Sequence, residues 1–335
     1  MKRKVSFVIL LLFVFIIFNP ISIEANSSIS QSDYPEAGAV ILNSNIEADY
    51  TKLPYEIKVS KKIKLFNQRG IDEFGEIKIR FNKEAEEIKI VKAQTMKDDG
   101  SVVEVKDEAI HEITPPELSN ANIYSNARIK VMNMPGLESG SVIEYTYIKK
   151  IKKERIKDNF SFSTYIQSTE PIKNSQLKIK IPANKELNFD TRPEGFEPDI
   201  KKDDGIKKYL WEKEDIAAVK KEPSMPPLAN IYDYIRVSTV DDWEKISKWY
   251  KTLLTDQYEL NDELKKKVHE LSSQKESKRA KAAALYNYVA EKIRYVGLEY
   301  GIGGYKPHKA VEVYENRYGD CKDKAALMVA MAGQQ

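Results

Sequence analysis

The sequence has a single cysteine, Cys321, and three histidines among its 335 residues. One thiol excludes an internal disulfide and dithiol redox chemistry, and one cysteine with three scattered histidines excludes a zinc site. A glycine-rich phosphate loop is absent, and no basic cluster lies outside residues 149–157 to form the charged face that nucleic-acid binding needs. We therefore expect no cofactor, no metal and no nucleic-acid partner.

The composition is that of a folded, two-domain chain. Hydrophobic residues make up 41% and charged residues 31%, and the formal net charge is +3. The length exceeds that of one ordinary domain, and the apolar content is enough for a sizeable core. Disorder over most of the chain is therefore excluded.

The N-terminus carries a signal for export. Basic residues 2–4 precede the apolar run 5–18, Pro20 breaks the run, and Ala25 ends a short cleavage sequence. This pattern predicts a signal peptide over residues 1–25, cleaved near Ala25, and hence a periplasmic, cell-surface or extracellular protein. The run is short for a membrane span, and an uncleaved anchor is the alternative. No cysteine follows the run, so we expect no lipid anchor at a cysteine.

Residues 26–50 are rich in serine, asparagine and alanine, and we expect a leader into the fold. Over residues 51–225, apolar and charged side chains alternate with period two, as in antiparallel sheets with one wet face. Turn signals that contain glycine or proline separate these runs. We predict an α+β protein whose first domain, 51–225, is an antiparallel β-sandwich-like domain. The alternating apolar positions are Tyr55, Ile57, Val59; Ile77, Ile79, Phe81; Ile143, Tyr145, Tyr147; and Leu177, Ile179, Ile181.

The pattern becomes helical in the second domain, residues 226–335. A proline-rich joint at 222–230 leads to an expected strand at 231–237. Asp241 and Glu244 then predict the capping box of a first helix. The expected apolar helix positions are Trp243, Ile246, Tyr250, Leu253; Leu264, Val268, Leu271; and Ala282, Tyr286, Val289, Ile293.

Cys321 lies where a helix should begin. Gly319 permits a sharp turn, Asp320 suits the N-cap, and Asp323 is placed as its capping-box partner. A thiol in the first helical turn has its thiolate favoured by the macrodipole. Lys322 adds a positive charge, which Asp320 and Asp323 oppose. The spacing suits a nucleophile, and an inert core cysteine is the alternative.

Longer motifs around this cysteine carry a family resemblance. Residues 286–331, with the block Arg317–Ala325 above all, resemble the first half of the bacterial transglutaminase-like core, a relative of the papain-like cysteine proteases. Residues 50–240 resemble the β-rich domain of unknown function that often precedes this core in exported bacterial proteins. The resemblance implies a partial, mainly helical transglutaminase-like core in the second domain.

The resemblance also implies a Cys–His–Asp triad that acts on a protein or peptide substrate by amide hydrolysis or acyl transfer. Only Cys321 carries over, because the family's histidine and aspartate follow the cysteine. The histidines here, His111, His269 and His308, all precede it. We expect His111 at a surface and His269 in a solvated or packing role. His308 is a candidate substitute base on the wrong side of the motif.

We therefore expect a C-terminally truncated chain with little or no turnover, either a fragment of a longer enzyme or the product of a truncated gene. The alternative is a non-enzymatic scaffold whose β domain binds a component of the cell envelope. The basic run at 149–155 suits a solvated hairpin end, or contact with an anionic lipid or polymer. Five further tyrosines are more typical of a core than of a groove: Tyr232, Tyr234, Tyr295, Tyr300 and Tyr305.

Overall fold

The computed structural model describes residues 29–334. The predicted signal peptide lies outside these residues. The chain divides into one unit that ends at Pro35 and a second that begins at Glu36. In the first unit, η1 (Gln31–Asp33) is closed by a capping box between Ser30 and Asp33. In the described part of the chain, no helix is long and apolar enough to span a membrane.

An eight-stranded sheet organises the β domain within the described residues. Its strands are β1 (Ala39–Asp49), β2 (Tyr55–Leu65), β4 (Glu86–Met96), β5 (Val102–Glu104), β9 (Val142–Ile151), β11 (Ile172–Pro182), β13 (Asp199–Asp203) and β14 (Ile206–Ile216). Their order is β13-β14-β11-β1-β2-β9-β4-β5. Neighbours are antiparallel, as predicted, apart from the parallel pair β1 and β11.

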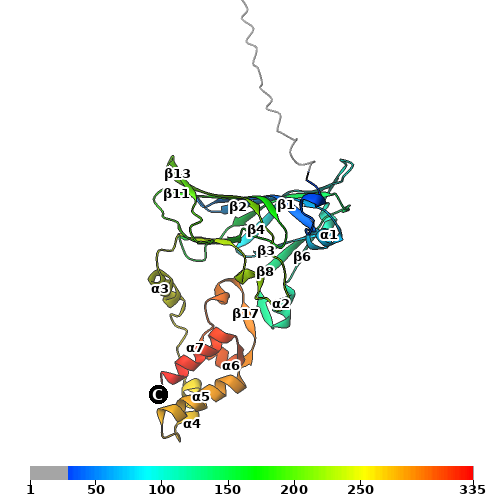
Figure 1. The fold of residues 1–335 in the computed structure, drawn as a ribbon. Coiled ribbons are helices and arrows are strands. Elements are labelled where there is room, and N and C mark those ends of the chain that lie inside the picture. The colour runs from blue at the N-terminus through cyan, green and yellow to red at the C-terminus, as the bar shows by residue number, and fades with distance from the viewer. Residues whose placement is uncertain (1–28, 335) are drawn as a thin grey trace, which may run out of the picture. The chain divides into compact units, whose positions relative to one another are not determined.

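Two three-stranded sheets pack against this large sheet. They are β3-β8-β6, from β3 (Glu76–Asn82), β6 (Ile110–Ile113) and β8 (Ala127–Asn133), and β10-β15-β12, from β10 (Ser161–Tyr165), β12 (Asn188–Arg192) and β15 (Tyr234–Ser238). Figure 1 shows β3, β6 and β8 along one side of the large sheet. The predicted sandwich-like domain is therefore present, with its second layer divided in two.

Strand β2 explains why both small sheets cover the same face. Side chains two apart on a strand share a face. Ile57 and Val59 enter the core formed with β15, whereas Ile63 and Leu65 enter the core formed with β3 and β8. Lys61 has the same parity, so it lies on the covered face at the seam between the two cores.

The domain limits differ from our expectation at both ends. The expected leader, residues 26–50, contains β1, which lies between β11 and β2 in the large sheet. A bulge between Ile41 and Asn43 interrupts its register and hides the alternation in the sequence. Beyond residue 225, β15 returns to pair with β10 and β12, so the β domain extends past the proline-rich joint.

Helices dominate the second part of the chain. They are α3 (Trp243–Leu253), α4 (Asp262–Ser272), α5 (Lys278–Lys292), α6 (Ala310–Asn316) and α7 (Cys321–Ala332). Helices α4 to α7 share one apolar core. The N-cap of α3 is Asp242, not Asp241 as predicted, because the Asp242 carboxylate accepts the Lys245 N–H. In α5, Leu285 rather than the exposed Tyr286 shares the buried face with Val289.

Short elements complete the fold. They are α1 (Gln68–Phe74), α2 (Pro116–Asn120), η2 (Asp107–Ala109), η3 (Leu228–Asn230), η4 (Gly301–Gly304), β7 (Ile123–Ser125), β16 (Arg294–Tyr295), β17 (Gly297–Glu299) and β18 (Tyr318–Gly319). Strand β17 pairs in parallel with β7 of the β domain, and β16 pairs in parallel with β18. These pairings fix the chain just before Cys321 and the loop that contains η4.

Candidate functional site

The cysteine helix α7 begins as the sequence predicts. The Asp320 carboxylate accepts the backbone N–H groups of Lys322, at 3.0 Å, and Asp323, at 3.2 Å. In return, the Asp320 N–H donates to Asp323 Oδ2 at 3.1 Å. This reciprocal pair is a capping box, and both carboxylates are buried. Cys321 is therefore the first helical residue, and it is exposed.

Gly319 is required by a close approach. A Cβ atom at this position would lie 2.6 Å from Asp323 Cβ, closer than packed side chains allow. The Val296 N–H donates to the Gly319 carbonyl at 3.2 Å, next to the pairing of β16 with β18. The glycine thus lets the backbone pass against the capping box without displacing Asp323.

Lys322 does not place a free positive charge beside the thiol. Its ammonium group forms an ion pair with the Asp320 carboxylate. Because that carboxylate is fully buried, the lysine compensates a charge that would be costly alone. The motif residues Asp320 and Lys322 therefore act as a pair that stabilises the helix start.

His308 reaches the cysteine helix from the loop before α6. Its backbone N–H donates to Asp323 Oδ1 at 2.8 Å, and its Nδ1 atom lies 3.2 Å from both carboxylate oxygens. The imidazole is 39% exposed. Contact through Nδ1 leaves Nε2 available to other groups. Among the described residues, no hydrogen bond joins His308 to the Cys321 thiol.

Tyr295 lies near the cysteine, because β16 pairs with β18 and places Tyr295 opposite Gly319. Burial, followed by the charges of Cys321 and Asp320, raises the pKa of the Tyr295 hydroxyl, which therefore stays protonated at neutral pH. The side chain is 48% exposed, so it is not the core residue that we expected. Sequence alone did not connect Tyr295 to the cysteine, because β16 and β18 bring the two elements together.

The other predicted positions lie elsewhere. His111 is exposed on β6 and His269 is exposed on α4, in agreement with surface or solvated roles. Tyr300 and Tyr305 are also exposed, whereas Tyr234 is buried, so the expectation of core tyrosines holds only in part. Within residues 29–334, no group of three metal-binding side chains is present.

Two family matches cover most of the domains described above. The domain of unknown function DUF3857 matches residues 54–220, and the transglutaminase-like superfamily matches residues 265–333. The chain is a DUF3857 domain followed by a transglutaminase-like segment. Cys321 and all four of its motif neighbours lie within the transglutaminase-like segment. No curated protein matches the chain.

A solved structure of a proposed protease from Parabacteroides distasonis has the same fold. It matches with a TM-score of 0.75 at 20% sequence identity, over 89% of this chain and 59% of that one. The present chain thus spans 59% of the length of that protein, and at this identity the likeness shows the fold alone.

Two further matches are too distant to support a conclusion about the fold. Aminopeptidase A from Legionella pneumophila has a TM-score of 0.30 at 13% identity, over 62% of this chain and 22% of that one. An M1 zinc metallopeptidase from Deinococcus radiodurans has a TM-score of 0.32 at 8% identity, over 60% of this chain and 42% of that one.

Proposed function

We propose that the chain has a protease-like role in which the Cys321 thiol attacks an amide or ester carbonyl of a protein or peptide. The observation that carries this proposal is the exposed thiol at the first position of α7, directly behind the buried Asp320 cap. A structural, inert cysteine would instead be buried in apolar surroundings. The transglutaminase-like match over residues 265–333 supports the same chemistry.

The start of the helix offers a site for the carbonyl oxygen. The first amides of a helix have no acceptor within it. Here the amides of Lys322 and Asp323 bind the Asp320 side chain, and the amide of Lys324 binds the Asp320 carbonyl. The Cys321 N–H has no acceptor among the described residues. We infer that it donates to the oxyanion that forms when the adjacent sulfur attacks.

The reaction then follows from the balance of bonds. The Cys321 thiolate forms a bond to the carbonyl carbon, the carbon–nitrogen bond breaks, and the leaving amine takes up a proton. The thioester that results is cleaved by water, which gives hydrolysis, or by a second amine, which gives acyl transfer. Both routes release the thiol unchanged.

Proton transfer limits turnover in this chain. A general base and acid must lie within hydrogen-bond reach of the reacting groups. Among the described residues, His308 contacts Asp323 rather than the thiol, and Tyr295 stays protonated at neutral pH. We infer that residues 29–334 favour formation of the thioester over its rapid turnover.

The N-terminal sequence bears on where the protein acts. We propose that residues 1–25 direct export and are removed near Ala25, with retention as a membrane anchor as the alternative. Sequencing the N-terminus of the mature protein from cell fractions tests this. A mature chain that retains Met1 in the cytoplasmic fraction contradicts export.

Acylation of Cys321 tests the proposed function directly. The chain is mixed with a p-nitrophenyl ester of an N-acetylated amino acid, quenched with acid and mapped by mass spectrometry. We expect one acyl group on Cys321, and none at this position in Cys321→Ser under the same conditions. Acylation confined to lysines, or modification of Cys321 no faster in the folded chain than after unfolding in urea, contradicts the proposal.

A further inference from the structure

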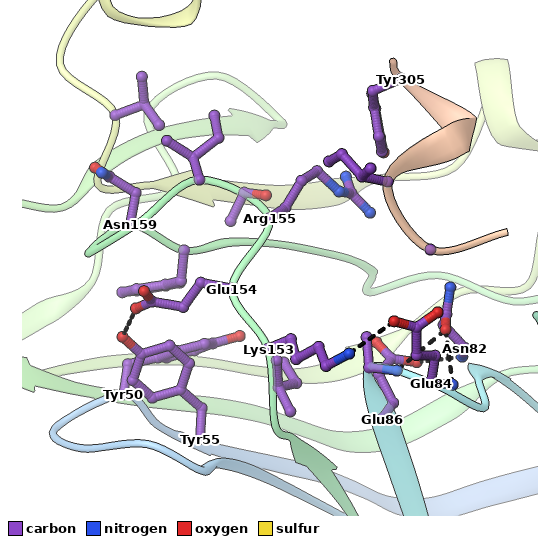
Figure 2. A pocket seen from close by; sticks show the side chains of 18 residues that line it. Tyr50, Tyr55, Asn82, Glu84, Glu86, Lys153, Glu154, Arg155, Asn159 and Tyr305 are labelled. Atoms are coloured by element: carbon purple, nitrogen blue, oxygen red, sulfur yellow. Dashed lines mark hydrogen bonds and ion pairs between the residues drawn. The ribbon is translucent and has the colours of Figure 1, made fainter. Parts of the chain in front are cut away.

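A cavity of about 470 Å³ lies between the β domain and the loop that contains η4. Figure 2 shows side chains from several elements directed around it. Aromatic and aliphatic groups from both sides line it, including Phe160, Ile156 and Ile302. The volume is that of a small-molecule or short-peptide site.

Two of the three glutamates in the wall have lysine partners. Glu84 is 2.7 Å from the Lys153 ammonium, and Glu86 is 3.6 Å from that of Lys149. The basic run at 149–155 is therefore largely a set of ion pairs, consistent with its expected solvated position. These carboxylates are neutralised by the protein itself, so they do not call for a cationic ligand.

The carboxylate of the third glutamate, Glu154, also has partners. Glu154 accepts the Tyr55 hydroxyl through Oε1 and the Asp158 N–H, at 2.8 Å, through Oε2. Figure 2 shows Glu154 turned toward Tyr55, whereas the next side chain, Arg155, extends toward Tyr305. The glutamates of the cavity wall thus have partners. Two other groups of the wall are hydrogen-bond donors that have no acceptor among the described residues.

Tyr50 is the first of these donors. Its side chain is 3% exposed, it stacks on Phe160 with a centroid distance of 3.5 Å, and its hydroxyl has no hydrogen-bond partner among the described residues. Burial, with a smaller contribution from Glu86, raises the pKa of Tyr50, so the hydroxyl remains protonated. A buried hydroxyl without a partner is rare, and Tyr50 is one of the residues that line the cavity.

Arg155 is the second donor. Its guanidinium carbon lies 4.9 Å from the centroid of the Tyr305 ring. The Tyr305 and Trp249 rings pack edge to face, with their centroids 5.6 Å apart. No carboxylate pairs with Arg155 in the described part of the chain. A guanidinium fixed over an aromatic ring, with its donors free, is suited to binding a carboxylate.

We propose that this cavity binds the carboxyl-terminal end of an apolar peptide. The terminal carboxylate pairs with Arg155, an upstream backbone carbonyl accepts the Tyr50 hydroxyl, and the apolar side chain packs among Phe160, Ile156 and Ile302. A simple apolar carboxylic acid shares the carboxylate chemistry but has no peptide carbonyl for Tyr50. The choice of a peptide over such an acid rests on the proposed function, whereas binding itself does not require Cys321.

Calorimetry with three probes tests the proposal on the whole chain. The probes are N-acetyl-alanyl-leucine, its C-terminal amide, and 4-methylpentanoic acid. We expect the free acid to bind and the amide to bind about tenfold to a hundredfold more weakly, because a charge-assisted contact is lost. Equal binding of acid and amide overturns the role of the carboxylate. Binding of 4-methylpentanoic acid as tight as that of the peptide overturns the peptide assignment.

Variants identify the residues. Arg155→Gln should weaken binding of the free acid about tenfold or more, and Tyr50→Phe about fivefold, through loss of one neutral hydrogen bond. Tyr50→Phe removes a hydroxyl that has no partner, so the fold should be retained. Lys157→Gln, an exposed residue outside the cavity wall, is the matched control and should bind normally.

The cysteine variant separates this site from the proposed function. Cys321→Ser should bind the peptide as the parent does, whether or not Cys321 proves to be acylated. Loss of binding in Cys321→Ser, or unchanged binding in Arg155→Gln, overturns the assignment of this cavity.

Discussion

The Asp323 carboxylate lies 3.2 Å from the Nδ1 atom of His308, and it also closes the capping box of the helix that begins at Cys321. One buried side chain therefore joins the start of α7 to the loop before α6. His308 is held beside the cysteine helix by this contact, although no hydrogen bond between it and the thiol is present in the described residues.

Asp323→Asn should lower the free energy of unfolding by about 1–3 kcal/mol, because it removes the charge from a buried hydrogen-bonding group. Urea denaturation measures the change. The control is a double-mutant cycle with His308→Gln, in which the two losses should be less than additive. Fully additive losses would show that the two side chains do not interact.

Tyr295→Phe should slow the alkylation of Cys321 by iodoacetamide about threefold to tenfold at neutral pH. The variant removes a hydroxyl that the pairing of β16 with β18 places near the sulfur, and a hydrogen bond from such a hydroxyl contributes about 0.5–1.5 kcal/mol. Tyr300→Phe is a suitable control, since Tyr300 is also exposed and lies at the start of η4 rather than on β16. An unchanged rate in Tyr295→Phe would rule out a role for this hydroxyl at the thiol.

Lys61→Met should stabilise the protein and raise its melting temperature. Burial at the seam between the two cores of the β domain lowers the pKa of the Lys61 ammonium. The charged form is thus disfavoured in the fold at neutral pH, and this penalty is relieved as the pH rises toward the ordinary lysine value. Thermal unfolding of the variant at neutral pH measures the gain, and a lower melting temperature contradicts the assignment.

The protein should lose stability in alkali as tyrosines packed against the cores ionise. Burial raises the pKa of Tyr147 from 10.0 to about 12. A raised pKa gives stability that is fully present below pH 10 and is lost as the pH rises through the folded value. Denaturant titrations between pH 9 and 12 measure how the free energy of unfolding falls with pH. The fall should be less steep in Tyr147→Phe, by the slope that the release of about one proton contributes. An identical decline in the variant would contradict this interpretation.

The strands could be predicted where one face meets water and the other meets the core. In β2, β3, β9 and β11, apolar side chains recur at every second position, and the period is visible in the sequence alone. Strand β1 was missed because its bulge breaks that period and because both of its faces are largely buried near Ala39. Its parallel pairing with β11 is also set by contacts far apart in the chain.

The residues of the candidate site could likewise be predicted only where a local motif places them. The cap on Cys321 could be predicted because Asp320 and Asp323 are its near neighbours and a capping box is a local motif. Tyr295 and His308 could not be assigned, because a β pairing and a buried carboxylate bring them in from other elements. Tyr50 and Arg155 meet at the cavity for the same reason, and neither has a motif of its own.

The most direct test of the nucleophile is the alkylation rate of Cys321 in the folded chain relative to the same chain unfolded in urea. The chain has one thiol, so the measured alkylation rate belongs to Cys321. We predict that the folded chain reacts faster, by about tenfold, because its exposed sulfur lies at the N-terminus of α7, where the helix dipole is positive. A folded chain that reacts at the unfolded rate or more slowly would show that Cys321 is an inert surface thiol.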